Sequence, residues 1–162
     1  MITDTPTWDR ITDVVVVGTG AGAMAAATLA ADGGAEVVVV EKDAVVGGTT
    51  GVSGGVMWIP NNHHMADAGV ADSPEEARAY IRHLADGRAP DPRLIDVFVD
   101  TAPEMLAYLE AKTPLRMQTV QNFPDYYFGF DIPGKKAAAR SVEPVPFPVR
   151  AELPGWADRI AA

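Results

Sequence analysis

The chain has 162 residues, 48% of them apolar and 22% charged, which is the composition of a folded domain rather than of a disordered segment. A formal net charge of −9 argues against a nucleic-acid partner, and the lack of cysteine excludes disulfides and thiolate metal sites. No apolar run approaches the roughly 18 residues of a membrane span, and the polar N-terminus does not resemble a signal peptide. We therefore expect a cytoplasmic protein with no transmembrane segment.

The first structural signal is a strand, a glycine-rich turn, a helix and a second strand. Val14–Val17 is a continuous β-branched run, which predicts a strand buried on both faces as in a parallel sheet. Ala21–Asp32 is rich in alanine and predicts a helix that ends at Gly33, and residues 36–40 predict the second strand. This order predicts a Rossmann-like βαβ unit.

The turn and the end of the second strand carry a dinucleotide fingerprint. Gly18 permits the sharp turn, Gly20 allows a pyrophosphate to approach the backbone, and Ala23 stands at the third fingerprint position. Glu41, at the end of the second strand, can accept hydrogen bonds from a ribose diol and would repel a 2′-phosphate, which disfavours NADP. The alternative is a glycine turn without a ligand. The cofactor-binding residues predicted here are Gly18, Gly20, Gly22, Ala23, Glu41 and Lys42.

A second cluster of glycines and hydroxyls follows at once and points to FAD rather than NAD. The residues EK, GGTT and SGG resemble the flavoprotein family of fumarate reductases and 3-ketosteroid dehydrogenases. The resemblance implies that this loop runs along the FAD pyrophosphate toward the isoalloxazine ring, and small residues let backbone lie against a flat ring. A plain flexible loop is the alternative. The residues concerned are Gly47, Gly48, Thr49, Thr50, Ser53, Gly54 and Gly55. Some members of this family hold FAD covalently through a histidine just before the SGG turn. No histidine occurs in residues 49–52, so the resemblance implies non-covalent FAD.

The next segment is expected to be largely helical. Residues 56–60 predict a short strand, and the adjacent His63 and His64 should point in different directions, as turn or helix-start residues. We therefore predict no metal site, and leave a position beside the substrate as the alternative. Ser73 and Glu76 form a capping box that predicts a helix as far as residues 86–87.

Further along, a second helix is expected from Asp91, and Pro103 should break it or restart it behind a new cap. Residues 115–120 predict a strand. The proline-rich stretch up to Pro154 has few apolar runs, so we expect it to lie over a surface supplied by other elements.

Several further motifs narrow the resemblance to one group within this flavoprotein family. GGVMWIPNN, FPDYY and RSVEP are similar to the N-terminal part of the 3-ketosteroid Δ1-dehydrogenase group. In that group FAD accepts a hydride from a steroid ring carbon while a tyrosinate removes the neighbouring proton. The resemblance implies that Tyr126 supports ionisation of that base and that Phe123 lines the steroid cavity. A tyrosine with its usual pKa near 10 needs such help at neutral pH. An ordinary loop tyrosine is the alternative for Tyr126.

The predicted fold class is α/β: an FAD-binding βαβ unit and flavin loop (13–60), a helical segment (61–112) and a loop-rich segment bearing FPDYY (113–162). The resemblance implies a flavin-dependent dehydrogenase acting on CH–CH groups, with an apolar steroid-like substrate. We expect an N-terminal part of an FAD-binding domain, incomplete at its C-terminal end, truncated or completed by a second polypeptide, because two strands leave open sheet edges. The alternatives are a fumarate reductase-like enzyme, which the apolar region 123–130 disfavours, and an inactive fragment that needs a partner chain.

Overall fold

The computed structural model describes residues 7–161, which form two compact units. The first contains the described residues up to Ser53 together with residues 148–161, and the second contains residues 54–147. Among the described residues, no helix has both the length and the apolar character needed to cross a bilayer.

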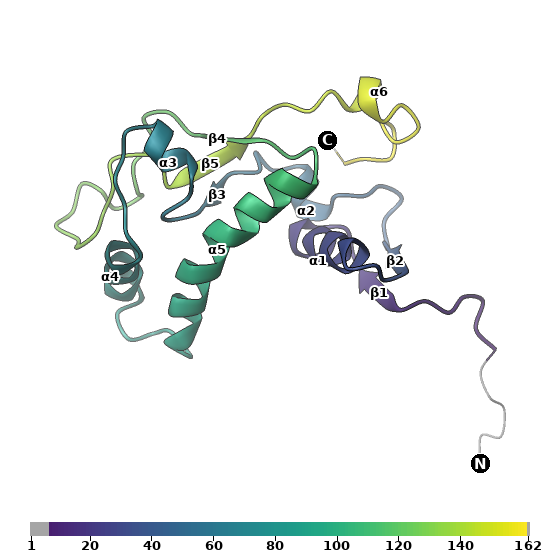
Figure 1. The fold of residues 1–162 in the computed structure, drawn as a ribbon, viewed down its shortest axis with the longest axis horizontal. Helices are drawn as coiled ribbons and strands as arrows, with labels where there is room; N and C mark the ends of the chain where they lie inside the picture. The colour runs from purple at the N-terminus through teal and green to yellow at the C-terminus, as the bar shows by residue number, and fades with distance from the viewer. Residues whose placement is uncertain (1–6, 162) are drawn as a thin grey trace, which may run out of the picture. The chain divides into compact units, whose positions relative to one another are not determined.

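The first unit is built on a parallel strand pair with a helix between the strands (Figure 1). β1 (Val14–Val17) pairs with β2 (Val37–Val40), with Val14 opposite Val37 and Val17 opposite Val40. α1 (Ala21–Asp32) connects them, with Gly20 as its N-cap residue and Gly33 at its C-terminal end. The two strands and the helix predicted from the sequence are confirmed, and β2 begins one residue later than expected.

Burial of β1 differs from the prediction. Val16 is buried, whereas Val15 is 59% and Val17 81% exposed. A strand in a parallel sheet is buried on both faces when elements cover both, but here β1 has one neighbouring strand and one helix. The β-branched run therefore forms the predicted strand but leaves apolar side chains exposed.

The glycine–threonine loop after β2, expected to run along the cofactor without regular structure, contains one short helix, α2 (Gly48–Gly51). The end of the described chain returns to this loop after α6 (Val149–Glu152). The Val46 amide donates to the Arg159 carbonyl at 2.7 Å, and the Ala161 amide donates to the Val46 carbonyl at 2.8 Å. A Cβ on Gly51 would stand 3.1 Å from the Ala161 carbonyl oxygen, so glycine permits this close approach.

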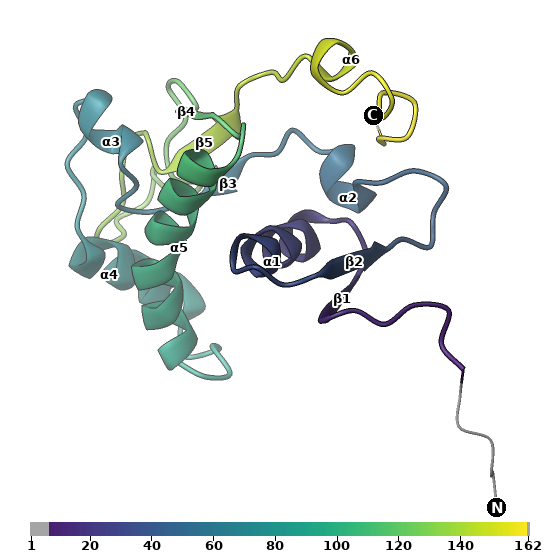
Figure 2. The ribbon, with the colours of Figure 1, turned by 45° about the vertical axis from the view of Figure 1, so that its right-hand side comes forward.

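The second unit combines a three-stranded antiparallel sheet with helices (Figure 2). Its elements, in chain order, are β3 (Met57–Trp58), α3 (His64–Asp67), α4 (Pro74–Ala85), α5 (Arg93–Lys112), β4 (Met117–Thr119) and β5 (Ser141–Pro144). The strand order is β3-β5-β4, so the last strand in sequence lies at the centre of the sheet.

Two apolar clusters hold this unit together. In the first cluster, Ala102 and Leu106 of α5 pack with Met117 of β4, Val142 of β5 and Ile59. This packing joins the helix to the sheet. The second cluster joins α4 and α5 through Ala77, Ile95 and Val99. Both depend on α5, so this helix is the main support of the unit.

The N-cap predicted for α4 is found in the structure, whereas the break predicted in α5 is not. The Ser73 Oγ accepts a hydrogen bond from the Glu76 amide at 3.2 Å, which confirms the N-cap. The reciprocal half of the capping box is replaced, because the Ser73 amide donates to Asp72 instead. The expected break at Pro103 is wrong: α5 runs through it. Pro103 lacks an amide hydrogen, but buried apolar residues on both sides of it keep the helix packed.

The expectation for the proline-rich stretch is also wrong in part. Residues 139–144 do not lie over the surface of other elements; β5 is the central strand, and Arg140, Ser141 and Val142 are buried. The proline in this strand, Pro144, is its last residue and lies opposite Met117 of β4. The strand expected within residues 115–120 is confirmed as β4.

Candidate functional site

The turn between β1 and α1 has the features that a phosphate-binding turn requires. Gly18 has a φ of +92°, a conformation that favours glycine, and its amide donates to the Val40 carbonyl at 2.7 Å. A Cβ added to Gly18 or Gly22 would meet no atom within 4 Å, so there is open space beside the start of α1. Backbone amides at a helix N-terminus attract anions, and the residues here fit a pyrophosphate.

Thr19 joins this turn to the end of β2 and to the loop that follows. Its Oγ1 donates to Glu41 Oε2 at 2.5 Å and accepts from the Gly47 amide at 2.8 Å. The side chain is buried, so these are its partners in place of water. Sequence reasoning did not include Thr19 among the site residues, because it stands at a variable position of the fingerprint.

The Glu41 carboxylate is held in its charged form. The hydrogen bond from Thr19, followed by the Asp43 amide at 3.1 Å, lowers the pKa of Glu41 below its usual value. A carboxylate has about four acceptor positions, so the two bonds leave capacity for further donors. A ribose diol is a donor pair of this kind.

The predicted loop residues of the first unit gather around the N-terminus of α1. Thr50 Oγ1 accepts from the Ala21 amide at 3.1 Å, and a Cβ on Gly48 would lie 3.9 Å from Gly20. Gly47 has a φ of +121°, which turns the chain into α2. Other predicted residues lie on the exposed or half-exposed surface of this unit: Gly22, Ala23, Lys42, Thr49 and Ser53.

Gly54 and Gly55 belong to the second unit, whereas Gly18 and Gly20 belong to the first. Gly55 has a φ of +67°, and a Cβ there would stand 2.9 Å from the Pro144 side chain. Packing against the end of β5 therefore accounts for glycine at this position.

A buried arginine is the centre of the second unit. Arg140 donates to Asp72 through Nε at 2.8 Å and through Nη2 at 2.7 Å, and to Asp125 through Nη1 at 2.9 Å. Its guanidinium also lies over the rings of Trp58 and Tyr80, 5.2 and 5.5 Å from their centres. All three charged side chains are about 1% exposed. This arrangement satisfies a buried charge with paired hydrogen bonds and aromatic faces.

Asp125 holds the FPDYY motif in place. Its carboxylate accepts from the Trp58 indole at 2.7 Å and from the Lys136 amide at 2.8 Å, in addition to Arg140. The next residue, Tyr126, is 86% exposed. Phe123 packs edge-to-face against Tyr126, with ring centres 6.0 Å apart. The two residues predicted to serve the substrate are therefore in contact, next to a fixed backbone position.

An apolar pocket of about 380 Å³ lies beside this motif. Its lining consists of Trp58, Tyr80, Ile81, Leu84, Ala85, Tyr126 and Tyr127, and Phe123 is not among them. Burial, together with the negative charge of Asp125, raises the pKa of Tyr80, so its hydroxyl stays protonated at neutral pH. A pocket of this lining accepts an apolar group and offers hydroxyls at its edge.

Arg140, Asp72 and Trp58 were missed as site residues. RSVEP and FPDYY were recognised as motifs, but nothing local shows that Arg140 and Asp125 pair. The available signals were a basic residue directly before Ser141, and an acidic residue between Pro124 and Tyr126.

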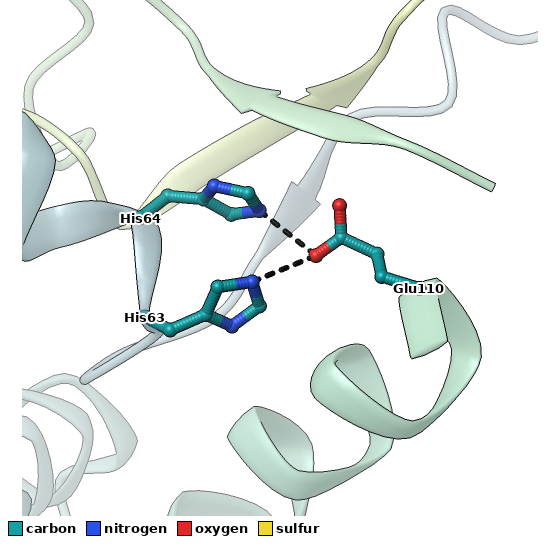
Figure 3. A group of neighbouring side chains, drawn as sticks. All are labelled: His63, His64 and Glu110. Carbon is teal, nitrogen blue, oxygen red and sulfur yellow. Dashed lines mark hydrogen bonds and ion pairs between the residues drawn. The ribbon is translucent and has the colours of Figure 1, made fainter. Parts of the chain in front are cut away.

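The prediction that the two adjacent histidines are helix-start residues is confirmed, whereas the different directions expected for their side chains are wrong. Their rings converge on one carboxylate oxygen of Glu110, at 2.8 Å for His63 and 2.9 Å for His64 (Figure 3). His63 lies at the N-terminal cap of α3 and His64 is its first residue, so the local backbone follows neither a long helix nor a strand. The side-chain directions expected from regular structure therefore do not apply.

Comparison with known proteins identifies the family. A family model described as FAD binding domain matches residues 13–151. The chain belongs to this FAD-binding family. The cofactor of the family is FAD, which agrees with the amide-lined turn and the Glu41 carboxylate.

Relatives of this FAD-binding chain include dehydrogenases of cyclic ketones. It is 46% identical over 138 residues to a 3-oxosteroid 1-dehydrogenase of Mycobacterium tuberculosis. The aligned region covers 85% of this chain and 24% of that relative. It is 40% identical over 148 residues to a 4-oxocyclohexanecarboxylate 2-dehydrogenase of Sinomonas cyclohexanicum, covering 91% of this chain and 25% of that protein. The relatives are FAD-family oxidoreductases.

A solved structure agrees. The 3-ketosteroid Δ1-dehydrogenase of Sterolibacterium denitrificans, in complex with 1,4-androstadiene-3,17-dione, matches with a TM-score of 0.77 and 41% identity. The match covers 84% of this chain and 23% of that one. The chain thus spans about a quarter of the length of the relatives it matches, within their N-terminal part.

Proposed function

We propose that this chain supplies the first part of a flavin-dependent dehydrogenase that oxidises a 3-ketosteroid-like ring ketone. The observation that carries the proposal is the apolar pocket at the FPDYY motif, lined by Tyr126, in a chain 46% identical to a 3-oxosteroid 1-dehydrogenase. Oxidation of a CH–CH bond beside a ketone needs an apolar cavity for the rings and a proton acceptor near the ketone.

For the cofactor, the proposal assigns each residue of the first unit a task. The amides of Gly20 and of the first turn of α1 beyond Ala21 hold the FAD pyrophosphate, and the Glu41 carboxylate accepts hydrogen bonds from the ribose diol. Thr19 orients Glu41 and the amide of Gly47 together. Bound FAD supplies the hydride acceptor. We take the first unit as half of a Rossmann-like FAD site. We take FAD as non-covalently bound because no histidine occurs in residues 49–52.

For the substrate, Tyr126 acts as a positioning residue. Its hydroxyl would donate a hydrogen bond to the tyrosinate that removes the substrate proton, and Phe123 would pack against the steroid. Supporting this role, Asp125 is fixed by three donors, so the neighbouring Tyr126 projects from a defined backbone position.

We also infer that further polypeptide completes the domain. Val15, Val17, Val39 and Val40 of the strand pair are more than a third exposed. β-branched residues of a parallel sheet are usually covered on both faces, so additional strands or helices would remove this apolar surface from water. A location in the cytoplasm remains a prediction.

The test is dye-coupled oxidation of a 3-ketosteroid in the presence of FAD. The 162-residue chain is assayed alone and together with polypeptide encoded next to it. We expect steroid-dependent dye reduction only in the combined sample. Absence of steroid-dependent reduction in both samples, while FAD is bound, contradicts the proposed substrate. Tight FAD binding by the chain alone contradicts the need for further polypeptide.

A second candidate substrate is a smaller ring ketone bearing a carboxylate, because a relative of 40% identity is named for 4-oxocyclohexanecarboxylate. The same assay, run with both ketones at equal concentration, separates them by kcat/KM. The apolar pocket favours the steroid. Fumarate reduction, measured with a reduced dye, tests the more distant alternative.

A further inference from the structure

A cluster of two imidazoles and one carboxylate lies in the second unit, apart from the FPDYY pocket. His63 Nε2 and His64 Nε2 both face Glu110 Oε2, at 2.8 and 2.9 Å (Figure 3). The three ligand atoms all lie within 4.8 Å of one another. Neither the FAD site nor the substrate pocket uses them.

One carboxylate oxygen faces two imidazole nitrogens in this cluster. The two rings are 4.1 Å apart between centres, so two protonated imidazoles would repel each other, and one carboxylate offers a single negative charge. When both Nε2 atoms carry no proton, the cluster presents two imidazole lone pairs and one carboxylate to a cation. A divalent cation satisfies all three groups together.

We propose that His63, His64 and Glu110 form a binding site for a divalent transition-metal ion of the Zn²⁺ type. Two histidines and a glutamate are a known ligand set for zinc, which leaves a fourth position for water. Tetrahedral zinc with bonds of about 2.0–2.1 Å separates its ligand atoms by about 3.4 Å. The two nitrogen–oxygen distances, 2.8 and 2.9 Å, are about half an ångström shorter than this spacing.

The surroundings of Glu110 hold the carboxylate in the required orientation. Its second oxygen, Oε1, accepts from the Met117 amide at 2.8 Å, which leaves Oε2 directed at the rings. Arg116 Nη1 donates to the carbonyl of Glu110 at 2.8 Å and so fixes the last turn of α5. Hydrogen bonds that orient a ligand in this way are a regular feature of metal sites.

The site has access to solvent and room for a fourth ligand. His63 is about half exposed, whereas Glu110 is 12% exposed. His64 also lines a pocket of about 510 Å³ together with Asp67 and Met117. An ion can enter beside His63, and water can complete its coordination shell. Bound metal would join the start of α3 to the end of α5.

The test is a titration of the metal-free 162-residue chain with ZnCl₂, followed by calorimetry and reversed with EDTA. We expect one equivalent to bind, and excess Zn²⁺ to raise the Tm. Single replacements His63→Gln, His64→Gln and Glu110→Gln should weaken binding by at least about 10-fold, the least that even an outer-shell partner contributes. Co²⁺ should give the visible absorption of a coordinated ion in the parent and lose it in Glu110→Gln.

The chain contains a matched control, because it has three histidines and the third, His83, lies on α4 outside the cluster. His83→Gln should keep the parent affinity to within about twofold. Far-UV circular dichroism checks that each variant folds; in Glu110→Gln the side-chain amide oxygen can still accept from the Met117 amide. Absence of stoichiometric Zn²⁺ binding, or equal loss in His83→Gln and Glu110→Gln, overturns the proposal and leaves a histidine–carboxylate hydrogen-bond cluster only.

Discussion

Arg140 and Asp72 form a two-pronged ion pair in the interior of the second unit, with both side chains about 1% exposed. The pair links β5 to the segment that precedes α4, and its other arm reaches Asp125 beside the FPDYY motif. Loss of Arg140 leaves the Lys136 ammonium, at 3.9 Å, as the cation beside Asp72, and leaves Asp125 with its neutral donors.

Arg140→Met is expected to destabilise the protein by about 3–5 kcal/mol, the usual cost of breaking a buried ion pair from one side. Methionine fills much of the volume but cannot donate hydrogen bonds. Urea unfolding followed by circular dichroism measures the change. The control is Arg88→Met, whose ion pair with Asp86 is exposed on both sides and should cost less than about 1 kcal/mol. Equal effects of the two replacements would contradict a special role for Arg140.

Stability should fall in acid through Asp72. Burial alone would raise the pKa of this carboxyl, but the hydrogen bonds and charge of Arg140, with the Asn61 and Ser73 amides, outweigh it and hold the pKa below its usual value. Because the folded pKa is the lower one, the stabilisation is present above about pH 4, the unfolded value, and is lost as pH falls through the folded pKa.

We therefore expect the free energy of unfolding to decline steadily below about pH 4 in the parent and less steeply in Asp72→Asn, which is already weaker at pH 7. Urea denaturation at a series of pH values measures both curves. Asp67→Asn, which changes an exposed aspartate, should retain the parent slope. A parent-like acid slope in Asp72→Asn would assign the acid sensitivity to other carboxyls.

Thr19→Val should weaken FAD binding without changing the shape of the turn. Valine keeps the branched side chain but removes the hydroxyl that donates to Glu41 and accepts from the Gly47 amide. We expect a loss of affinity of about 10-fold or more, since a hydrogen bond to a charged group contributes about 1.5–3 kcal/mol. Flavin fluorescence measures FAD binding. The parent sample is the one that binds FAD, either the chain alone or the chain together with the polypeptide encoded next to it.

The same replacement should raise the pKa of Glu41 toward its usual value, because the Thr19 hydroxyl is the main cause of its lowering. Carboxyl-carbon NMR follows this titration independently of FAD. Thr28→Val is the control: its hydroxyl donates to the Met24 carbonyl within α1, and its loss should leave both properties unchanged.

Tyr126→Phe should reduce steroid turnover by about 100-fold or more in the complete enzyme, within the range that assisted proton transfer contributes. Flavin content should stay at the parent value, because Tyr126 lies in the second unit and outside the phosphate-binding turn. The pH profile of kcat should shift upward as the base loses its hydrogen-bond donor. Tyr108→Phe, on α5, should have parent kinetics. Unchanged turnover in Tyr126→Phe would make it an ordinary loop residue.

The sequence predicted the elements whose cause is local. The β-branched runs, the alanine-rich helix and the Ser73 cap all follow from residues within a few positions of one another, and each was found. The residues proposed for the first part of the FAD site could be named from the sequence because the glycines and Glu41 belong to one continuous βαβ segment. Pro103 shows the limit of local signals, since tertiary packing on both sides of it overrides the preference to break the helix.

The features missed from the sequence all depend on residues far apart. Arg140 pairs with Asp72, which lies 68 positions earlier, and His64 meets Glu110, which lies 46 positions later. Spacing rules for metal ligands assume regular helices or strands, whereas His63 and His64 lie where a short helix begins. Residues 139–144 have the composition of a loop, and only the flanking strands give them the role of a central strand.

The contrast between Asp125 and Tyr126 has a consequence for how variation would be tolerated. One residue is sealed inside the unit and the next projects into solvent, so a single peptide bond separates a folding determinant from a proposed functional one. Natural changes at Arg140, Asp72 or Trp58 would therefore have two effects together. They would reduce the amount of enzyme in the cell, and they would displace Tyr126. A survey of variants by activity alone would mistake these distant positions for active-site residues, and measuring protein abundance alongside activity would separate the two effects.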